Sequence, residues 1–434
     1  MPSATPRRAF VIWSMAVMVY VAAVFHRTSL GVASLDAADR FGVGPTALGA
    51  FTVLQIGLYA LMQVPTGLLV DHFGPRRVLT AAAVLMGTGQ LLFALAASYP
   101  LGLLARAVLG VGDAMTFVSV LRLVAAHFPA RRYAALTALT GTLGGVGNLI
   151  ATVPLALLLG GIGWTITFAV AGAVTVAYAA VVALRLRDVP AGTVVPPVRP
   201  ALSLRAVLAD VGRSWRVPGT RLGFWVHFAT MAAPGVLGLL WGFPYLVEQG
   251  LSTGAAGSVL SMLVLGLLVG GPLIGVVISR RPDWRMPFVV GYLASTLLTW
   301  LVLLGWPGER VPVVVLVVAF GWLSVGGPAS SISFALARDY NPLHRVGTAS
   351  GVVNVGGFVA ITASALAVGL LLDLTGSFGI ALLSVVGLQV LGFWRTAVWW
   401  RRARAAVFAA QERGEDVPVR LRQRRRWDVT AAAA

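Results

Sequence analysis

The chain contains no cysteine and no lysine, and only 11% of its residues are charged. Without cysteine, it can form no disulfide, thiolate nucleophile or cysteine-ligated metal site. Soluble domains carry about 25% charged residues, so these 434 residues lack the polar surface that soluble domains need. The 50 glycines suit helices that pack closely in lipid. We therefore predict an integral membrane protein.

Signatures of catalysis are also missing. We find no phosphate-binding Gly-Lys-Ser loop, no zinc-ligand spacing and no convincing Ser/His/Asp set. The sequence therefore predicts neither an enzyme nor a bound cofactor or metal. A net charge of +18 would suit nucleic acid, but the arginines lie in short segments between apolar runs. This pattern favours the lipid bilayer as partner over nucleic acid.

Long apolar runs define the predicted fold. A helix needs about 20 apolar residues to cross the bilayer core. Twelve runs of this kind are present, so we predict an all-α membrane protein with twelve transmembrane helices. The predicted spans are 9–35, 46–70, 76–99, 101–127, 132–160, 162–184, 221–249, 254–279, 286–306, 311–338, 346–372 and 376–400.

The arginines predict the orientation. If both termini are cytoplasmic, the cytoplasmic segments hold nearly all arginines, and the opposite loops hold only Arg40 and Arg310. Cytoplasmic loops carry this excess of positive charge in membrane proteins generally. We therefore predict a multi-pass protein of the cytoplasmic membrane, acting as a monomer, with both termini inside.

A segment rich in proline and arginine divides the helices into two sets of six. We interpret 185–220 as a cytoplasmic linker with an amphipathic helix near 203–215. It separates an N-terminal bundle, 9–184, from a C-terminal bundle, 221–402. A basic cytoplasmic tail, 403–434, follows.

The two halves also resemble each other. Aligned pairs are Pro129 with Pro342, Arg132 with Arg345, Gly144 with Gly357, Gly67 with Gly275, and Arg77 with Arg285; Ser279 stands opposite Asp71. Two copies of a six-helix unit are typical of transporters, which place the substrate site near the bilayer midplane.

The stretch GLLVDHFGPRR at 67–77 combines Gly67, Asp71, Gly74, Arg76 and Arg77. This stretch resembles the signature between helices 2 and 3 of the major facilitator superfamily. The resemblance implies two pseudo-symmetric six-helix bundles that work by alternating access. We expect the glycines to let helices approach, and Asp71 to pair with Arg76 or Arg77 and face a helix N-terminus, forming a latch. The alternative is a charged turn that only orients insertion.

Arg27 lies within the first predicted span, in FHRTSLGVA, which resembles helix 1 of anion:cation symporters. A guanidinium within a membrane usually faces a cavity or a partner, and it can hold a carboxylate through two hydrogen bonds. A structural ion pair, or a side chain that reaches the outer interface, is the alternative. Further predicted substrate contacts, which can equally be bonds between helices, are Tyr20, Gln55, Tyr59, Trp241 and Asn354.

Asp113 is the carboxylate closest to the middle of a predicted span, so it is our candidate proton carrier. Arg106 lies on the same helix face and is predicted to assist it. Asp113 can also pair with Arg27, either as part of coupling or as a static lock between helices. We predict proton-coupled uptake of a small organic anion. Proton-driven efflux of drugs or amphipathic cations and a non-transporting membrane sensor are the alternatives.

Overall fold

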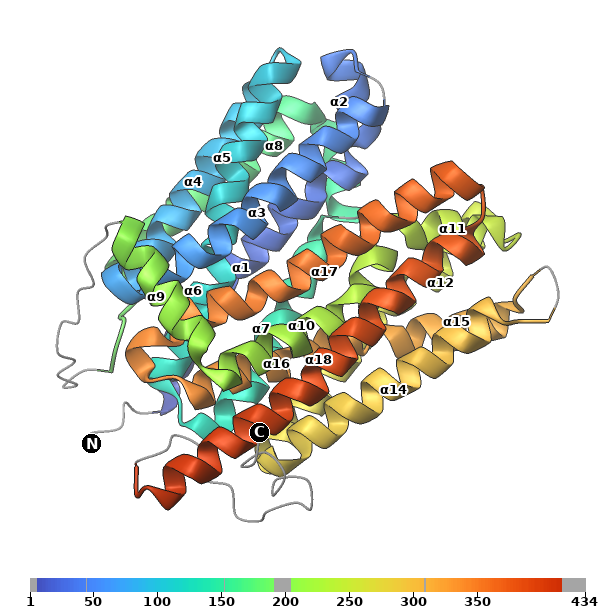
Figure 1. The fold of residues 1–434 in the computed structure, drawn as a ribbon. Helices are drawn as coiled ribbons and strands as arrows, with labels where there is room; N and C mark the ends of the chain where they lie inside the picture. Colours follow the sequence, from blue (N-terminus) through green and yellow to red (C-terminus); the bar gives the residue numbers. More distant parts are fainter. Residues whose placement is uncertain (1–5, 44, 152, 191–203, 308–309, 416–434) are drawn as a thin grey trace. The chain divides into compact units, whose positions relative to one another are not determined.

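The computed structural model describes residues 6–43, 45–151, 153–190, 204–307 and 310–415, and throughout these ranges every regular element is a helix (Figure 1). The chain divides into two compact units. Unit 1 comprises Met1–Pro129, Leu143–Asp210 and Leu343–Gly351, and unit 2 comprises Ala130–Thr142, Val211–Pro342 and Val352–Ala434. Three helices, α7, α9 and α17, therefore contribute residues to both units.

The helices of the first half are α1 (Pro6–Val32), α2 (Ser34–Phe41), α3 (Pro45–Phe73), α4 (Pro75–Leu95), α5 (Tyr99–Ala114), α6 (Thr116–His127), α7 (Ala130–Ile150), α8 (Val153–Arg185) and α9 (Leu204–Arg216). Those of the second half are α10 (Pro218–Val236), η1 (Leu237–Trp241), α11 (Gly242–Glu248), α12 (Thr253–Leu260), α13 (Met262–Arg280), η2 (Pro282–Trp284), α14 (Arg285–Leu304), α15 (Val313–Leu323), α16 (Gly326–Tyr340), η3 (Leu343–Arg345), α17 (Val346–Thr375) and α18 (Phe378–Glu412).

In unit 1, α4 packs against both α5 and α8, and α3 packs against α5. Glycine makes the crossing of α4 and α8 possible. A Cβ atom at Gly87 would lie 2.7 Å from the carbonyl oxygen of Gly172, and a Cβ at Gly172 would lie 2.7 Å from that of Gly87. Small residues at such crossings let helix backbones approach closely in lipid.

In unit 2, α10 packs against α16 and α18. A buried polar chain ties α14 to α18: Trp300 Nε1 donates to Gln389 Oε1 at 2.9 Å, and Gln389 Nε2 donates to Thr296 Oγ1. All three side chains are almost fully buried. The outward faces are apolar instead, since Leu61, Leu184 and Val314 are each more than two-thirds exposed, as a lipid-facing surface requires.

Ten helices of the described residues are long and apolar enough to cross a membrane. The two other predicted spans are interrupted. The span 132–160 divides where α7 ends at Ile150, and 221–249 contains the π-helical turn η1 after Pro234, which lacks a backbone N–H. Gly163, with φ of 76°, marks the break within α8 between predicted spans 132–160 and 162–184.

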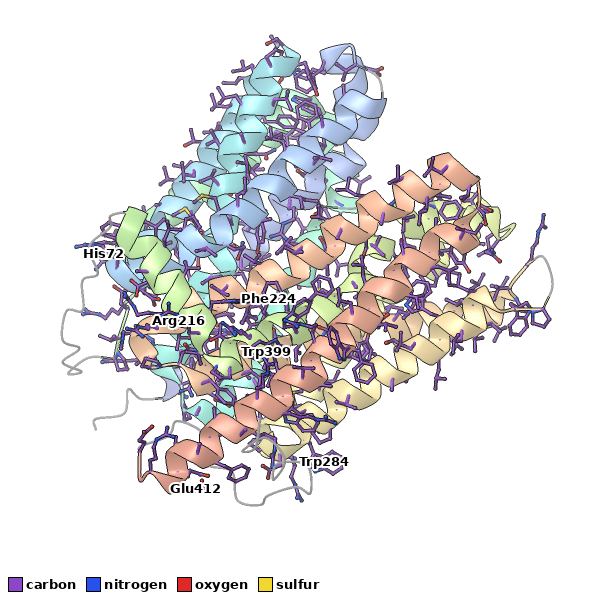
Figure 2. The ribbon with its side chains drawn as sticks, in the orientation of Figure 1. His72, Arg216, Phe224, Trp284, Trp399 and Glu412 are labelled. Atoms are coloured by element: carbon purple, nitrogen blue, oxygen red, sulfur yellow. The ribbon has the colours of Figure 1, made fainter. Side chains whose placement is uncertain are left out.

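Other boundaries differ from those predicted at the chain's polar ends. The predicted amphipathic helix near 203–215 is present as α9. The first helix begins and ends three residues earlier than predicted: α1 ends at Val32, and a separate short helix, α2, follows. The last helix is longer, because α18 continues to Glu412, labelled in Figure 2, past the predicted start of the tail at 403. Residues 191–203 of the predicted linker and residues 416–434 of the predicted tail lie outside the described residues.

Candidate functional site: a buried arginine–aspartate cluster

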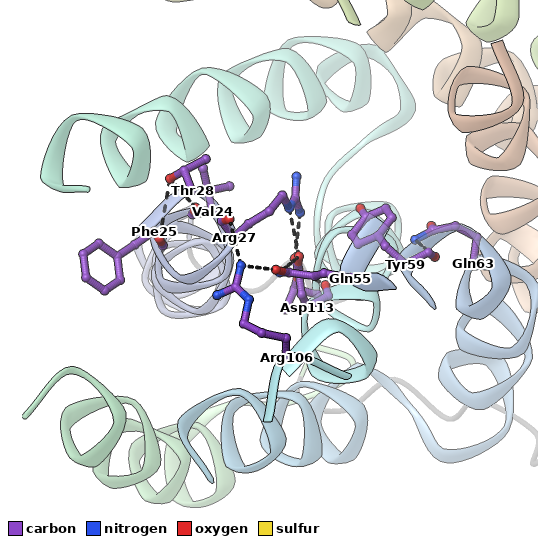
Figure 3. Close-up of polar contacts among 10 residues, drawn as sticks. Val24, Phe25, Arg27, Thr28, Gln55, Tyr59, Gln63, Arg106 and Asp113 are labelled. Carbon is purple, nitrogen blue, oxygen red and sulfur yellow. Dashed lines mark hydrogen bonds and ion pairs between the residues drawn. The ribbon is translucent and has the colours of Figure 1, made fainter. Parts of the chain in front are cut away.

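Three helices of unit 1 bring polar side chains to one buried place, shown in Figure 3. Arg27 on α1 holds Asp113 on α5 through two hydrogen bonds, from Nε to Oδ2 at 2.8 Å and from Nη2 to Oδ1 at 2.7 Å. Gln55 on α3 donates its amide to Asp113 Oδ2 at 3.4 Å. The Asp113 side chain is 0% exposed, whereas that of Arg27 is 25% exposed. The arginine thus remains accessible while its partner is not.

Arg106 also joins this cluster, but it does not pair directly with Asp113 in the described structure. It donates to the backbone carbonyl oxygens of His26, at 3.0 Å, and Arg27, at 3.3 Å, and to Gln55 Oε1. Gln55 therefore links Arg106 to Asp113. Because Arg106 is 1% exposed and bonded to α1 and α3, it holds the cluster's geometry and adds a buried positive charge.

The local sequence explains how these helices approach. Gly110 lies one turn before Asp113, and a Cβ there would lie 3.2 Å from Gln55 Cγ. The glycine thus gives Gln55 room to reach Asp113. In formal charge, two guanidiniums surround one carboxylate, which leaves the cluster at about +1 when Asp113 is ionised. Such a site attracts an anion and repels a cation.

The predicted aromatic contacts divide into three cases. The guanidinium of Arg27 lies over the Tyr59 ring, 4.7 Å from its centroid, so Tyr59 belongs to the cluster. Tyr20 lies on the same helix as Arg27, but its ring packs against Phe117, with centroids 5.1 Å apart. Trp241 belongs to unit 2, where its Nε1 donates to the carbonyl of Ala365 at 3.0 Å.

Asn354 is buried on α17 in unit 2. The same unit places His227 beside Ser333, with Nδ1 and Oγ 3.2 Å apart. The cluster around Arg27 therefore unites Arg27, Gln55, Tyr59, Arg106 and Asp113, and it does not include Trp241 or Asn354.

The predicted latch is built around Asp71, but its ionic partner differs from the prediction. Asp71 faces Arg122 on α6, at 3.3 Å, and not Arg76 or Arg77. The expectation that Asp71 faces a helix N-terminus is met, because it accepts hydrogen bonds at the start of α17. The donors are Thr348 N at 2.8 Å, Thr348 Oγ1 at 2.8 Å and Gly347 N at 3.2 Å.

The other residues of the predicted latch have separate partners. A Cβ at Gly67 would lie 2.6 Å from the carbonyl oxygen of Gly347, so the glycine lets α3 and α17 touch. The backbone N–H of Arg76 donates to Asp188 Oδ1 at 2.6 Å, and its Nε donates to the carbonyl of Ala183 at 2.7 Å.

Gly74 has a φ of 82°, and a Cβ there would overlap the Asp188 carboxylate. Burial raises the pKa of Asp188 above its usual range, and the hydrogen bond from Arg76 opposes this shift. Arg77 is exposed and lines a cavity of about 740 Å³ with His72, labelled in Figure 2.

Sequence reasoning missed Asp188 and the N–H donors of Gly347 and Thr348. Asp188 lies in the predicted linker, where no motif singles it out. The donors are backbone groups, which any residue except proline carries. The motif could not name them, although Thr348 lies near the start of the predicted span 346–372.

Comparisons with known proteins agree with this fold. The model of the Major Facilitator Superfamily matches residues 15–365, and the chain belongs to that family of membrane transporters. A probable galactarate/D-glucarate transporter of Escherichia coli is 26% identical over 407 residues, which cover 83% of this chain and 87% of that protein. A probable sulfoacetate transporter of Cupriavidus necator is 25% identical over 183 residues, and that match spans only 42% of either chain.

A solved structure shows the same architecture. The crystal structure of FucP, a Major Facilitator Superfamily transporter in the outward conformation, superposes with a TM-score of 0.70 at 15% identity. The match covers 90% of this chain and 99% of that one. The predicted fold class, an all-α transporter of two six-helix bundles, is thereby confirmed. The chain is a multi-pass membrane protein of a family of transporters, not of enzymes.

Proposed function

We propose that this protein imports a small organic anion together with a proton, by alternating access. The observation that carries the proposal is the paired geometry of Arg27 and Asp113 next to Arg106. A carboxylate of the substrate and the carboxylate of Asp113 require the same guanidinium edge. Binding of the anion is therefore linked to what happens to the charge on Asp113.

A proton resolves this competition. When Asp113 is protonated it loses its charge, so its attraction for Arg27 falls and the cluster rises to about +2. Arg27, which is already partly exposed, then offers two parallel N–H donors to a substrate carboxylate. A ligand can shift the carrier only through its different affinities for the two states. Protonation of Asp113 therefore raises the affinity for the anion, and bound anion raises the affinity of Asp113 for the proton.

The relatives support the class of substrate. Proteins similar to this chain include transporters whose names specify galactarate, D-glucarate and sulfoacetate, which are all organic acids. A cluster with two guanidiniums suits an acid with one or two anionic groups. Tyr59 and Gln55 would contact the same substrate, and we retain Tyr20, Trp241 and Asn354 as proposed contacts.

The proposed topology keeps both termini and the linker 185–220 in the cytoplasm, with bundles at 9–184 and 221–402. The Asp71 contacts would then form a cytoplasmic latch. Efflux of cationic drugs is less well supported, because both oxygens of Asp113 already face Arg27 and the cluster's charge repels cations. No contact in the described residues favours a non-transporting sensor.

Uptake into proteoliposomes tests the proposal. The purified protein is reconstituted, the exterior is made more acidic than the interior, and accumulation of radiolabelled D-glucarate and a panel of mono- and dicarboxylates is measured. We expect accumulation that collapses when a protonophore removes the pH gradient. Arg27→Ala should lower affinity by at least about 30-fold, since losing one partner of a buried charge pair costs about 2 kcal/mol or more.

Asp113→Asn separates proton coupling from anion binding and exchange. This variant should lose accumulation driven by the pH gradient but keep exchange of labelled for unlabelled anion. The matched control is Arg280→Gln, which removes an exposed arginine at the end of α13 and should leave both assays unchanged. If Arg27→Ala transports every tested anion normally, the proposed binding site is wrong.

A further inference from the structure

A second cavity of unit 1 lies apart from the cluster around Arg27. It has a volume of about 630 Å³ and lies where α1 begins and where α6 and α8 end. Its lining residues are Arg7, Arg8, Val11, Ile12, Met15, His127, Arg185, Arg187, Val189 and Pro190. Two arginines at the start of α1, one at the end of α8 and one just after it thus line one hollow, together with a histidine.

No carboxylate lines this cavity, although Asp188, which follows Arg187 in the chain, lies close enough to His127 to interact with it electrostatically. The four arginine side chains form no ion pair with any described residue. All four are exposed. His127 contributes a further polar atom, its Nε2, which is buried without a hydrogen-bond partner in the described structure. The other ring nitrogen, Nδ1, lies 3.1 Å from the carbonyl oxygen of Leu123.

The neighbouring cavity around Arg76 and Arg77 provides a contrast. There, Asp188 lines the hollow and accepts a hydrogen bond from the Arg76 backbone. That cavity therefore contains its own counter-charge. Positive loops alone do not explain the difference, because both cavities lie at the end of unit 1 that we assign to the cytoplasm.

The apolar part of the lining indicates what kind of anion fits. Val11, Ile12 and Met15 lie on one face of α1, and Val11 is 58% exposed. Beside the arginines, the site therefore offers an apolar surface on a helix that is long and apolar enough to span the membrane. A ligand that uses both parts has a phosphate group and an acyl chain. Basic pockets between helices on the cytoplasmic side bind such head groups in other membrane proteins.

We propose that this cavity binds an anionic phospholipid of the cytoplasmic leaflet. Its phosphate lies among Arg7, Arg8, Arg185 and Arg187, and its chain lies along Val11 on α1. The proposal rests on the proposed orientation but does not depend on the substrate or on proton coupling. The bound phosphate offsets the repulsion between four converging guanidiniums, so it stabilises unit 1.

The test measures lipid binding to the purified full chain in neutral detergent micelles. Phosphatidylglycerol is titrated in, and the bound lipid is counted by native mass spectrometry. Each arginine near a phosphate contributes about fivefold in affinity. The double variant Arg7→Gln/Arg185→Gln should therefore bind phosphatidylglycerol roughly 30-fold more weakly than the wild type.

Two matched variants distinguish a site from general attraction. Arg7→Lys/Arg185→Lys keeps the charge and should retain most of the affinity, which also shows that the fold tolerates substitution there. Arg280→Gln/Arg281→Gln removes two exposed arginines of unit 2 and should change affinity by less than about twofold. An equal loss in this control would overturn the proposal.

The choice of probe separates a lipid from a soluble phosphate. Phosphatidylglycerol should bind and raise the thermal midpoint, whereas phosphatidylcholine, which has no net charge, should bind much more weakly. Glycerol phosphate and inorganic phosphate carry the anion without a chain. If either binds as tightly as phosphatidylglycerol, the cavity is a site for a soluble phosphate and the lipid proposal is rejected.

Discussion

Replacing Asp71 by asparagine should weaken the contact between α3 and the start of α17. The carboxylate accepts hydrogen bonds from Thr348 N and Oγ1, both at 2.8 Å, and from Gly347 N at 3.2 Å, and it faces Arg122 at 3.3 Å. Asparagine has nearly the same shape but no charge. The substitution therefore tests the charge itself and leaves the packing almost unchanged.

The expected loss follows from these partners. A hydrogen bond to a charged group contributes about 1.5–3 kcal/mol, and a neutral one about 1 kcal/mol. The amide oxygen of asparagine keeps one or two neutral bonds to α17. Arg122, whose side chain is 11% exposed, loses its counter-charge but can still reach water. We therefore expect Asp71→Asn to lower the free energy of unfolding by about 2–3 kcal/mol.

A double-mutant cycle measures the ion pair. The free energies of unfolding of Asp71→Asn, Arg122→Gln and the double variant are measured by denaturant titration in detergent micelles. The double variant should be less destabilised than the sum of the single variants, by about 1–2 kcal/mol. Asp283→Asn, an exposed carboxylate of η2, serves as the control and should change stability by less than about 0.5 kcal/mol. Additive single effects would refute the pairing of Asp71 with Arg122.

Three further substitutions test the packing of the two units, each by the free energy of unfolding. Ser279→Asp should stabilise unit 2 by about 0.3–1 kcal/mol, because it adds a negative charge near the start of α7; a loss of stability would contradict this. Gly112→Ala should cost about 1–3 kcal/mol, since its Cβ would lie 2.8 Å from a carbonyl oxygen of α4. The control Gly141→Ala, with nothing within 4 Å of its Cβ, should cost nothing, and equal effects would contradict the close crossing of α4 and α5. Gln389→Leu should cost about 1–3 kcal/mol and shift tryptophan fluorescence, because it leaves the Trp300 N–H unpaired; unchanged emission would contradict that contact.

Most of the fold was predictable because lipid imposes a simple rule. Backbone groups in the bilayer must be satisfied within the helix, so long apolar runs identify the spans. The prediction was less successful where helices break. Gly163 and the π-helical turn after Pro234 interrupt runs that look continuous in hydropathy. The end of α18 was also misplaced, since arginines favour a cytoplasmic tail by charge but do not prevent a helix.

The candidate site was predictable in its residues but not in its connections. Charges within apolar spans are costly, which is why Arg27, Arg106 and Asp113 stood out. The sequence allowed Asp113 to pair with Arg27, and the structure shows that pair. It gave no sign that Gln55 stands between Arg106 and Asp113, because that depends on how α3 meets α5. Spacing along one helix cannot specify contacts between three.

The internal repeat relates two hydrogen bonds of the structure to each other. Ser279 aligns with Asp71, and Ala135 aligns with Thr348. In unit 2 the Ala135 N–H donates to Ser279 Oγ at 3.0 Å, and in unit 1 the Thr348 N–H donates to Asp71 at 2.8 Å. The same backbone position is thus satisfied once by a hydroxyl and once by a carboxylate.

Charge-assisted hydrogen bonds are roughly twice as strong as neutral ones, and an anion near a helix N-terminus gains from the dipole as well. The contact in unit 1 is therefore stronger than its counterpart in unit 2, although the backbone geometry is shared. In the proposed alternating-access cycle, these contacts break and re-form, and two charged contacts would raise the cost of leaving the latched state. Under that proposal, serine in place of aspartate in the second copy keeps one of the two contacts weak.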